Sequence, residues 1–554
     1  MVLKLLIGAL LIAAVYAQGI ERTVNVTQGL IQGIVQGNHV EFHGIPYAGY
    51  VAGEYRFKAA PPAPNFPGIF EASTPNIRCA QPSSNGIIGD ENCLVLNIFT
   101  RNITGSRPVM VWINGENYNS NSYESFNFNR LVEQEDLLVV TLNYRLSIFG
   151  FLCLGVEDAP GNAGLKDVIA GLKWIKDNIA EFGGNPNNVM LAGHGSGAAM
   201  VDLVTLSPLG TGLIHKAIAQ SGTSLSPWAV SYNPIEVAQE IASRLNITET
   251  DRTQLAIELR NTPLITLSPA LENPVVFNNF ASFAPCVEAP IESEEAFMTE
   301  APITILRSGD YSHIPFIAGF TNEEGSVRAH QAVHEDWLQQ MELNFEPFIP
   351  VDLGLADVEN RTEIINSIKN YYFKDQAITI ETINDYLDYH GDTLTLVSAI
   401  RTVMERAANS RSEVRLYEFS FVGSWAREWP YPTIPIDGAP HGQELVYLLG
   451  TGLLFDNPKQ IILLIYSVPI AVGNPGNLAW GNVAPGNIRY LEYVEVAQTG
   501  LIENARVNPH VQRMTFWNNL YQQYYVPPQQ VSSADKIFSC AFIIMICASL
   551  FRLF

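Results

Sequence analysis

The sequence is short of positive charge and of cysteine, and each shortage excludes a class of protein. It has 32 lysines and arginines against 55 aspartates and glutamates, which gives a formal net charge of −23. Because no basic stripe is present either, we expect no binding to nucleic acid. The six cysteines among 554 residues follow no spacing of a zinc site, so we expect no metal and no cofactor. The chain also lacks internal repeats of solenoid or propeller period and low-complexity linkers, which leaves a globular protein.

The first residues of the chain are apolar and are predicted to be a signal peptide. An apolar run of residues 5–15 follows Lys4, and Val15-Tyr16-Ala17 suits signal peptidase. The run is too short to span a bilayer. We therefore predict cleavage after Ala17, with residues 1–17 removed.

The last residues, 532–554, are predicted to be a membrane-tethering signal. Small residues at 532–534 precede an apolar run from 537 to 551, a pattern typical of a GPI signal with Ser532 or Ser533 as the attachment site. The polar spacer of such signals is nearly absent, so a short membrane anchor is the alternative. In either case the folded part, residues 18–531, is expected on the extracellular face of the plasma membrane or in the lumen. We find no convincing domain boundary inside it.

Sequons and cysteines in the body of the chain agree with the secretory pathway. Four N-x-[ST] sequons predict glycosylation at Asn25, Asn102, Asn246 and Asn360. Cys153 and Cys286 follow no recognisable pattern, and we expect them to be buried thiols.

Strand and helix patterns alternate along the first half of the body. Leu30–Val35 and His39–Ile45 are expected strands, while Val109–Ile113 and Leu137–Leu142 are apolar runs typical of strands buried on both faces. An amphipathic helix is predicted after Asn162, which is a candidate cap. Its apolar residues recur at three- and four-residue steps: Leu165, Val168, Ile169, Leu172 and Ile175.

The next segment repeats the alternation with a tight turn in it. Val189–Ala192 is a short apolar strand, residues 193–197 form a glycine-rich turn, residues 198–206 are helical in composition, and residues 216–219 begin another strand. This order predicts an α/β fold with a mostly parallel, doubly wound sheet. Further helices are expected at 393–409 and 512–524.

Several motifs in this order resemble the carboxylesterase type B, or cholinesterase-like, family. They are Phe42–Ala48, Arg56-Phe57, Asp90–Leu94, Asn143–Leu146, Gly161–Asp167, Phe182–Pro186 and Phe516-Trp517. The resemblance spans nearly the whole body. It implies the α/β-hydrolase fold, a large mostly parallel central sheet flanked by helices on both faces, and a disulfide between Cys79 and Cys93.

The family's chemistry is acyl transfer by a serine, a histidine and a glutamate, and the resemblance places two of the three. Residues 438–444 resemble the loop of the catalytic histidine, which implies His441, and residues 319–325 resemble the acidic loop, which implies Glu324. Ser221 and Glu444 resemble residues that surround this histidine. In such a triad the histidine takes the serine's proton, and the carboxylate fixes the histidine's tautomer.

The nucleophile is missing from its expected turn. The family has Gly-Glu-Ser-Ala-Gly after a strand, whereas this chain has Gly-His-Gly-Ser-Gly at 193–197, so the serine position is Gly195. A nucleophile displaced to Ser196 is the alternative. Its neighbours two residues away would be His194 and Ala198, and we expect its side chain to point elsewhere, because the turn needs small residues at both places.

The loop that would bind the oxyanion also departs from the family's His-Gly-Gly-Gly-Phe. Here it reads Asn114-Gly115-Glu116-Asn117-Tyr118, so two glycines are lost, and we expect Glu116 to bring negative charge to where an oxyanion would form. Backbone N–H groups of such a loop stabilise the negative oxygen of the intermediate. Two independent departures in one site predict that hydrolysis is lost.

Serine-less members of this family include adhesion proteins such as neuroligins, neurotactin and glutactin, and the glycine at the turn is similar to theirs. The resemblance implies a catalytically degenerate, membrane-tethered binding or adhesion protein. Its partner would be an extracellular protein or a small hydrophobic ligand, and it could form a homodimer. Two alternatives stay open: an active carboxylic-ester hydrolase with a displaced serine, and a protein that sequesters a hydrophobic ligand.

Overall fold

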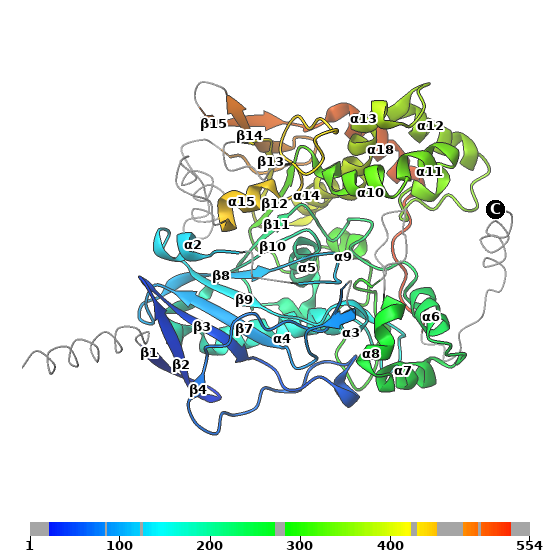
Figure 1. The fold of residues 1–554 in the computed structure, drawn as a ribbon. Coiled ribbons are helices and arrows are strands. Elements are labelled where there is room, and N and C mark those ends of the chain that lie inside the picture. Colours follow the sequence, from blue (N-terminus) through cyan, green and yellow to red (C-terminus); the bar gives the residue numbers. More distant parts are fainter. Residues whose placement is uncertain are drawn as a thin grey trace, which may run out of the picture.

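A 13-stranded sheet runs through the chain in the computed structural model (Figure 1), which describes residues 21–83, 86–121, 126–271, 283–422, 429–450, 480–496 and 500–532. The predicted signal peptide, Ser533 and the apolar run that follows it lie outside the described residues. No helix in the described ranges is long and apolar enough to cross a membrane.

The sheet is parallel in its centre and antiparallel toward both edges. Its order is β1-β2-β3-β7-β9-β8-β10-β11-β12-β13-β14-β15, with β4 paired to β2 off this path. The seven adjacent strands from β9 to β14 are parallel to one another. The strands are β1 (Glu21–Val26), β2 (Gly29–Gln36), β3 (His39–Pro46), β4 (Phe70–Glu71), β7 (Val95–Thr100), β8 (Arg107–Ile113), β9 (Leu138–Leu142), β10 (Gly184–His194), β11 (Lys216–Gln220), β12 (Phe316–Thr321), β13 (Val414–Phe419), β14 (Arg489–Val496) and β15 (Gly500–Val507). Two short strands, β5 (Gln81–Ser83) and β6 (Gly86–Ile88), form a separate hairpin.

Helices cover both faces of the sheet, as the alternation of side chains along β8 shows. Val109 and Val111 belong to one core, with helices α4 and α5, whereas Met110 and Trp112 belong to a second core with α2 and α15. The helices are α2 (Asn129–Glu133), α3 (Ser147–Phe151), α4 (Ala163–Asn178), α5 (Ser196–Leu206), α6 (Pro234–Arg244), α7 (Arg252–Asn261), α8 (Leu264–Leu267), α9 (Pro302–Ser308), α10 (Ala329–His334), α11 (Trp337–Leu343), α12 (Arg361–Phe373), α13 (Ile383–Gly391), α14 (Val397–Asn409), α15 (Gln443–Leu449) and α18 (Val511–Tyr524). Successive residues of a strand point to opposite faces, so a continuous apolar run needs cover on both. The predicted α/β fold is confirmed.

Of two local expectations about helices, the cap at Asn162 was wrong and the helix over 393–409 is confirmed. Asn162 stands before α4, but it has left-handed backbone angles (φ 56°) and its side chain makes no cap bond. Instead its amide exchanges two 2.8 Å hydrogen bonds with the backbone of Cys286. The predicted helix over 393–409 begins as a wider π-helical turn at Asp392–Leu396 that continues α13 into α14.

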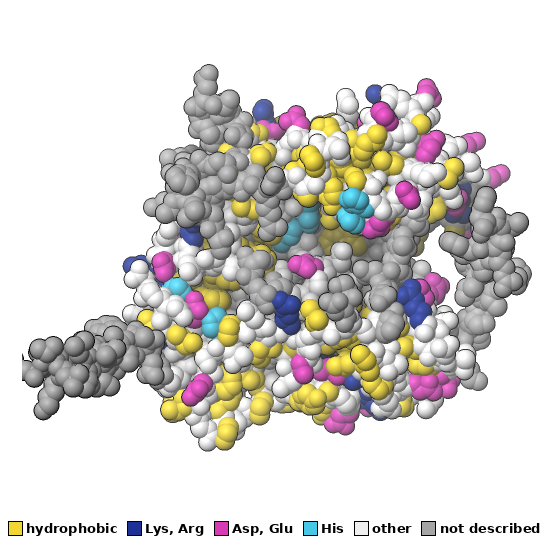
Figure 2. Space-filling view, in the orientation of Figure 1, with side chains coloured by type: hydrophobic (Ala, Val, Ile, Leu, Met, Phe, Trp, Pro, Cys, Tyr) yellow, Lys and Arg dark blue, Asp and Glu magenta, His cyan; other side chains and the backbone are white. Residues whose placement is uncertain are grey.

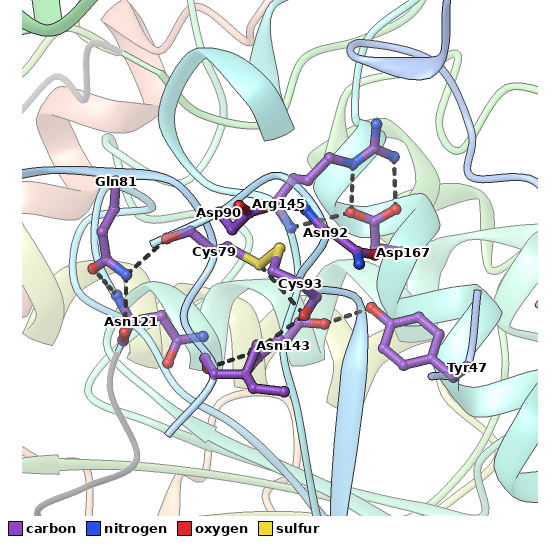
Figure 3. Close-up of a disulfide and its surroundings, with 11 residues drawn as sticks. Tyr47, Cys79, Gln81, Asp90, Asn92, Cys93, Asn121, Asn143, Arg145 and Asp167 are labelled. Atoms are coloured by element: carbon purple, nitrogen blue, oxygen red, sulfur yellow. Dashed lines mark hydrogen bonds and ion pairs between the residues drawn. A yellow bond between two sulfur atoms is a disulfide. The ribbon is translucent and has the colours of Figure 1, made fainter. Parts of the chain in front are cut away.

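The first disulfide, Cys79–Cys93, is confirmed, and it lies among motif residues (Figure 3). The side-chain amide of Asn143 donates to the carbonyl oxygen of Cys93 at 3.1 Å, and the Tyr47 hydroxyl donates to the carbonyl oxygen of Asn143 at 2.5 Å. These contacts join the chain around β3, the disulfide loop and the segment after β9. The family motifs in this region therefore stabilise the fold.

The expectation that Cys153 and Cys286 are free thiols is wrong, because they form a second disulfide with Cα atoms 6.6 Å apart. The pair is separated by 133 residues in the sequence. The hydrogen bonds between Asn162 and Cys286 hold the segment after Cys153 against the segment of Cys286. The spacing of the cysteines in the sequence does not indicate this contact. Two disulfides are typical of an oxidising compartment.

All four asparagines of the sequons are exposed: Asn25, Asn102, Asn246 and Asn360. Glycosylation there stays a prediction, and the exposure meets its steric requirement.

Candidate active site

The elbow after β10 has a glycine at its apex, with backbone angles that other residues avoid. Gly195 has φ 57° and ψ −124°, and α5 begins at the next residue. The flanking glycines are required by close packing: a Cβ on Gly193 would lie 2.7 Å from the carbonyl carbon of Gly197, and one on Gly197 would lie 2.3 Å from the carbonyl oxygen of Ile113. The turn thus keeps the tight strand-to-helix geometry of a nucleophile elbow without a nucleophile.

A side chain at the apex would have room. Among the described residues, and apart from its two chain neighbours, a Cβ built on Gly195 meets a single heavy atom within 4 Å, the carbonyl oxygen of Gly115 at 3.8 Å. A serine at this position would therefore be opposed by backbone strain and not by a steric clash with the described residues.

Ser196, the alternative nucleophile, points toward the neighbouring loop. Its side chain is 3% exposed, and its Oγ accepts the backbone N–H of Tyr118 at 3.2 Å. A hydroxyl that is buried and used as an acceptor for the loop is poorly placed to attack a ligand beside Gly195.

The loop after β8 holds its Glu116 carboxylate away from the elbow. Glu116 is exposed, and its Oε2 accepts the hydroxyl of Ser120 at 2.6 Å. Asn117 and Tyr118 both have left-handed backbone angles, with φ of 51° and 61°. Left-handed angles are uncommon for residues other than glycine and are an outlier for a bulky side chain such as tyrosine. Asn117, at one of the two lost glycine positions, and Tyr118 beside it therefore hold strained backbone angles, and the added charge of Glu116 faces solvent.

The histidine and the glutamate form a complete hydrogen-bonded pair. Glu324 Oε2 bonds His441 Nδ1, while its Oε1 accepts from the Ser221 hydroxyl at 2.6 Å and from the Thr321 backbone N–H at 2.8 Å. The backbone N–H of His441 donates to Ser326 Oγ at 2.9 Å. Both oxygens of the Glu324 carboxylate thus accept hydrogen bonds. They fix the ring of His441 through Nδ1, so that Nε2 is available to a ligand.

The charges of this pair support each other. Burial disfavours the charged form of Glu324, but the charge and hydrogen bond of His441, with the donors Ser221 and Thr321, hold the pKa of Glu324 below its ordinary value. Burial would likewise lower the pKa of His441, but the Glu324 carboxylate outweighs it and raises that pKa. An imidazole held this way can act as a general base.

Two further residues complete the surroundings of His441. The ring of His194 lies against it, with centroids 4.6 Å apart. Glu444 is fully buried, and burial followed by repulsion from Glu324 raises its pKa to about 8, so its carboxyl is largely neutral at pH 7. Gln220 lies at 3.5 Å from Glu444 Oε1.

The site lies at the carboxyl ends of neighbouring parallel strands. Asn114 follows β8, Gly195 follows β10, and Glu324 stands three residues after β12. The chain passes from β8 outward to β9 and then returns to β10 on the other side of β8, which makes this the topological switch point where α/β proteins bind ligands. Figure 2 shows histidine side chains beside a hollow on this face.

The predicted residues around the elbow and the histidine lie together in the structure, which also shows contacts that the sequence did not indicate. The missed contacts are His194 on His441, the hydroxyl of Ser326 and the N–H of Thr321. His194 directly precedes the apex glycine, and this position in the sequence could have indicated that its ring lies at the site. Within the described ranges, no group of three or more histidine, cysteine or acidic residues could hold a metal ion.

Comparison with known proteins gives one consistent result. A family model described as the carboxylesterase family matches residues 20–461. A carboxylic ester hydrolase of Bombus ignitus is 30% identical over 503 residues, covering 86% of this chain and 89% of that protein. Venom carboxylesterase-6 of Apis mellifera is also 30% identical, covering 86% and 90%. The crystal structure of juvenile hormone esterase from Manduca sexta, with OTFP covalently attached, matches with a TM-score of 0.81 at 27% identity, covering 91% of this chain and all of that one.

Proposed function

The chain belongs to the carboxylesterase family, and we propose that it is a member that binds a partner or ligand without hydrolysing an ester. One observation carries the proposal: Gly195 occupies the apex of the elbow and has no side chain with which to attack a carbonyl carbon. The position of Ser196 supports it, because that hydroxyl is buried and accepts the N–H of Tyr118.

The proposed setting is the extracellular face of the plasma membrane. Two disulfides and four exposed sequons support passage through the secretory pathway. A lipid tether near Ser532 or Ser533, or a short terminal anchor, would hold the protein there. In that place the protein would act in adhesion to an extracellular protein, like serine-less relatives, or would sequester a small hydrophobic ligand.

The second candidate is an active carboxylic-ester hydrolase. It is favoured by the intact pair of His441 and Glu324 and by the relatives, whose names are those of esterases. In this alternative Ser196 would serve as the nucleophile. Its hydroxyl would first have to leave the N–H of Tyr118.

Activity-based labelling separates the two candidates. The purified protein is treated with a fluorophosphonate probe and assayed with a short-chain nitrophenyl ester, beside an active relative and a Ser196→Ala variant. We expect no label and no turnover in the wild type. Turnover that disappears in Ser196→Ala would replace the proposal with the hydrolase.

A further inference from the structure

The place beside Gly195, where the family keeps a serine hydroxyl, can accept an atom from a ligand. Apart from the two adjoining residues, the one described atom that a Cβ there would meet within 4 Å is the carbonyl oxygen of Gly115, at 3.8 Å. The backbone keeps the elbow conformation. Among the described residues, this place therefore has room for a small polar atom.

Several hydrogen-bond donors near this place have no protein acceptor. Among the residues that the structure describes, the backbone N–H groups of Glu116, Asn117 and Ser196 donate no hydrogen bond, and His441 Nε2 has no partner. Ser196 N–H is also the first of α5, an 11-residue helix whose N-terminus carries partial positive charge. His441 is 25% exposed on its side chain and can therefore be reached by a ligand.

The ionisable groups around His441 differ from those of the family motif. Where the family motif has a glutamate before the serine, this chain has His194, whose ring lies 4.6 Å from that of His441. The Glu444 carboxyl is largely neutral at pH 7, and the Glu116 carboxylate is bonded to Ser120 at the surface. The carboxyl group that bonds His441 directly is that of Glu324, which has the largest charge effect on it.

We propose that this site binds a free carboxylic acid, as its carboxylate, rather than an ester. One carboxylate oxygen would accept from the N–H groups of the loop and of Ser196. The other oxygen would stand where the serine oxygen stands in an active relative, against His441 Nε2. No bond is made or broken.

The geometry of an acyl group explains why a carboxylate fits. In an acyl-enzyme the carbonyl carbon carries one oxygen in the oxyanion site and a second oxygen that belongs to the serine. A free carboxylate carries both oxygens itself, and it needs the space that Gly195 leaves open. A hydrogen bond between imidazolium and carboxylate is charge-assisted, which a neutral ester cannot match.

The inference rests on the proposed function, since a serine at 195 would fill the place of the second oxygen. For the rest of the ligand we propose an apolar tail, because ligand sites in proteins are in general mostly apolar beyond a few polar groups.

The test is a calorimetric titration of the purified full chain with decanoate, methyl decanoate and decanol, which share one tail. We expect decanoate to bind at least about tenfold more tightly than the other two, in line with the greater strength of charge-assisted hydrogen bonds. Gly195→Ala should reduce decanoate affinity at least about tenfold, because its methyl group takes the place of one oxygen. His441→Gln should weaken decanoate but leave methyl decanoate unchanged.

Gly37→Ala is the matched control for backbone strain. Gly37 has φ 58° and open space around it, but it lies in the β2–β3 turn, far along the sheet from the elbow. It should keep wild-type affinity for decanoate, with the folding of both variants checked by thermal melting. Equal affinity for decanoate and its methyl ester, or full affinity in a folded Gly195→Ala, overturns the inference.

The outcomes separate this inference from the proposed function. Turnover of an ester that is lost in Ser196→Ala overturns both. No turnover together with no preference for decanoate overturns the carboxylate site alone and leaves a binding protein with another ligand or partner.

Discussion

The two halves of the candidate site differ in how much the fold depends on them. The half that contains Ser221, Glu324 and His441 matches the family pattern, and its polar atoms are bonded to one another and to the backbone. The half that contains Gly195 and the loop at 115–118 departs from the pattern. Its apex residue contributes no side-chain contact at all.

An intact histidine–glutamate pair therefore does not by itself establish catalysis, because the fold also depends on it. A buried carboxylate that accepts three hydrogen bonds stabilises the fold, and removing it leaves donors unsatisfied. A nucleophilic serine at an elbow instead costs about 1–3 kcal/mol of backbone strain. Once hydrolysis is not needed, the serine can be lost with a gain in stability, while the pair is retained for packing.

The largest expected effect is on the bonded half. Glu324→Ala leaves Ser221, Thr321 and His441 without their common acceptor, so we expect a loss of about 3 kcal/mol or more in the free energy of unfolding. The measurement is urea unfolding followed by fluorescence. Glu346→Ala, which removes an exposed partner of Arg361, is the control and should cost less than about 1 kcal/mol. If Glu324→Ala unfolded at the wild-type midpoint, retention of the pair would need a functional reason.

The next effect is on the apex of the other half. Gly195→Ser should lower the free energy of unfolding by about 1–3 kcal/mol, because a serine must adopt φ near 57°. The open space around the apex means that strain, and not a clash, is the cause. A loss well above this range would show that the space is smaller than it is in the structure.

The same substitution tests the loop by activity. His441 and Glu324 can activate a new serine, but the loop has left-handed backbone angles at Asn117 and Tyr118, so we expect its free N–H groups to be aimed poorly at the oxyanion. Losing one such donor in another hydrolase reduces turnover by about 10²–10³. We expect a trace of nitrophenyl esterase activity from Gly195→Ser and a clear rise when Glu116→Gly and Asn117→Gly are added. Adding His441→Ala to the triple variant should silence it. Ordinary family activity from Gly195→Ser alone would mean that the loop is still competent.

A smaller effect is expected at Ser196. Ser196→Ala removes the acceptor of the Tyr118 N–H in a buried place, at a cost of about 1–2 kcal/mol. Thermal melting measures the loss, and Ser410→Ala, away from the site, serves for comparison. A change in ester turnover rather than in stability would assign Ser196 to catalysis.

The smallest effect is a dependence on pH. The pKa of His441 is raised in the folded state, so the folded protein binds this proton more tightly than the unfolded chain does. Its contribution is full below about pH 6.5, the ordinary histidine value, and is lost as the pH rises through the folded pKa. Glu324 and Glu444 lie close to it, and His194 packs on its ring. The difference in unfolding free energy between wild type and His441→Gln should therefore shrink from pH 6 to pH 9, and a constant difference would contradict this.

The sequence predicted the centre of the fold well, because its signal is local. The apolar run Val109–Ile113 is buried on both faces within β8, as expected. The disulfide between Cys153 and Cys286 could not be predicted, because it joins residues 133 positions apart through a contact that no spacing encodes.

For the site, the motifs predicted which residues meet, but not how they are oriented. Ser196 was expected to point elsewhere, and the structure gives its direction through the N–H of Tyr118. The Glu116 carboxylate was expected at the oxyanion position, but it turns to Ser120, because an exposed side chain can rotate toward solvent. Side-chain direction depends on neighbours that are distant in the sequence.

The open space over Gly195 has an evolutionary consequence. The elbow backbone is still shaped for a nucleophile, and the Cβ of a returning side chain would meet no atom of the described residues, other than the two adjoining ones, closer than 3.8 Å. A lineage could therefore regain a residue there in one step with the fold intact. The loop at Glu116 and Asn117 requires two more replacements before that residue becomes useful. Under the proposed function, the loop would therefore be the main obstacle to a return of activity, and the elbow would not.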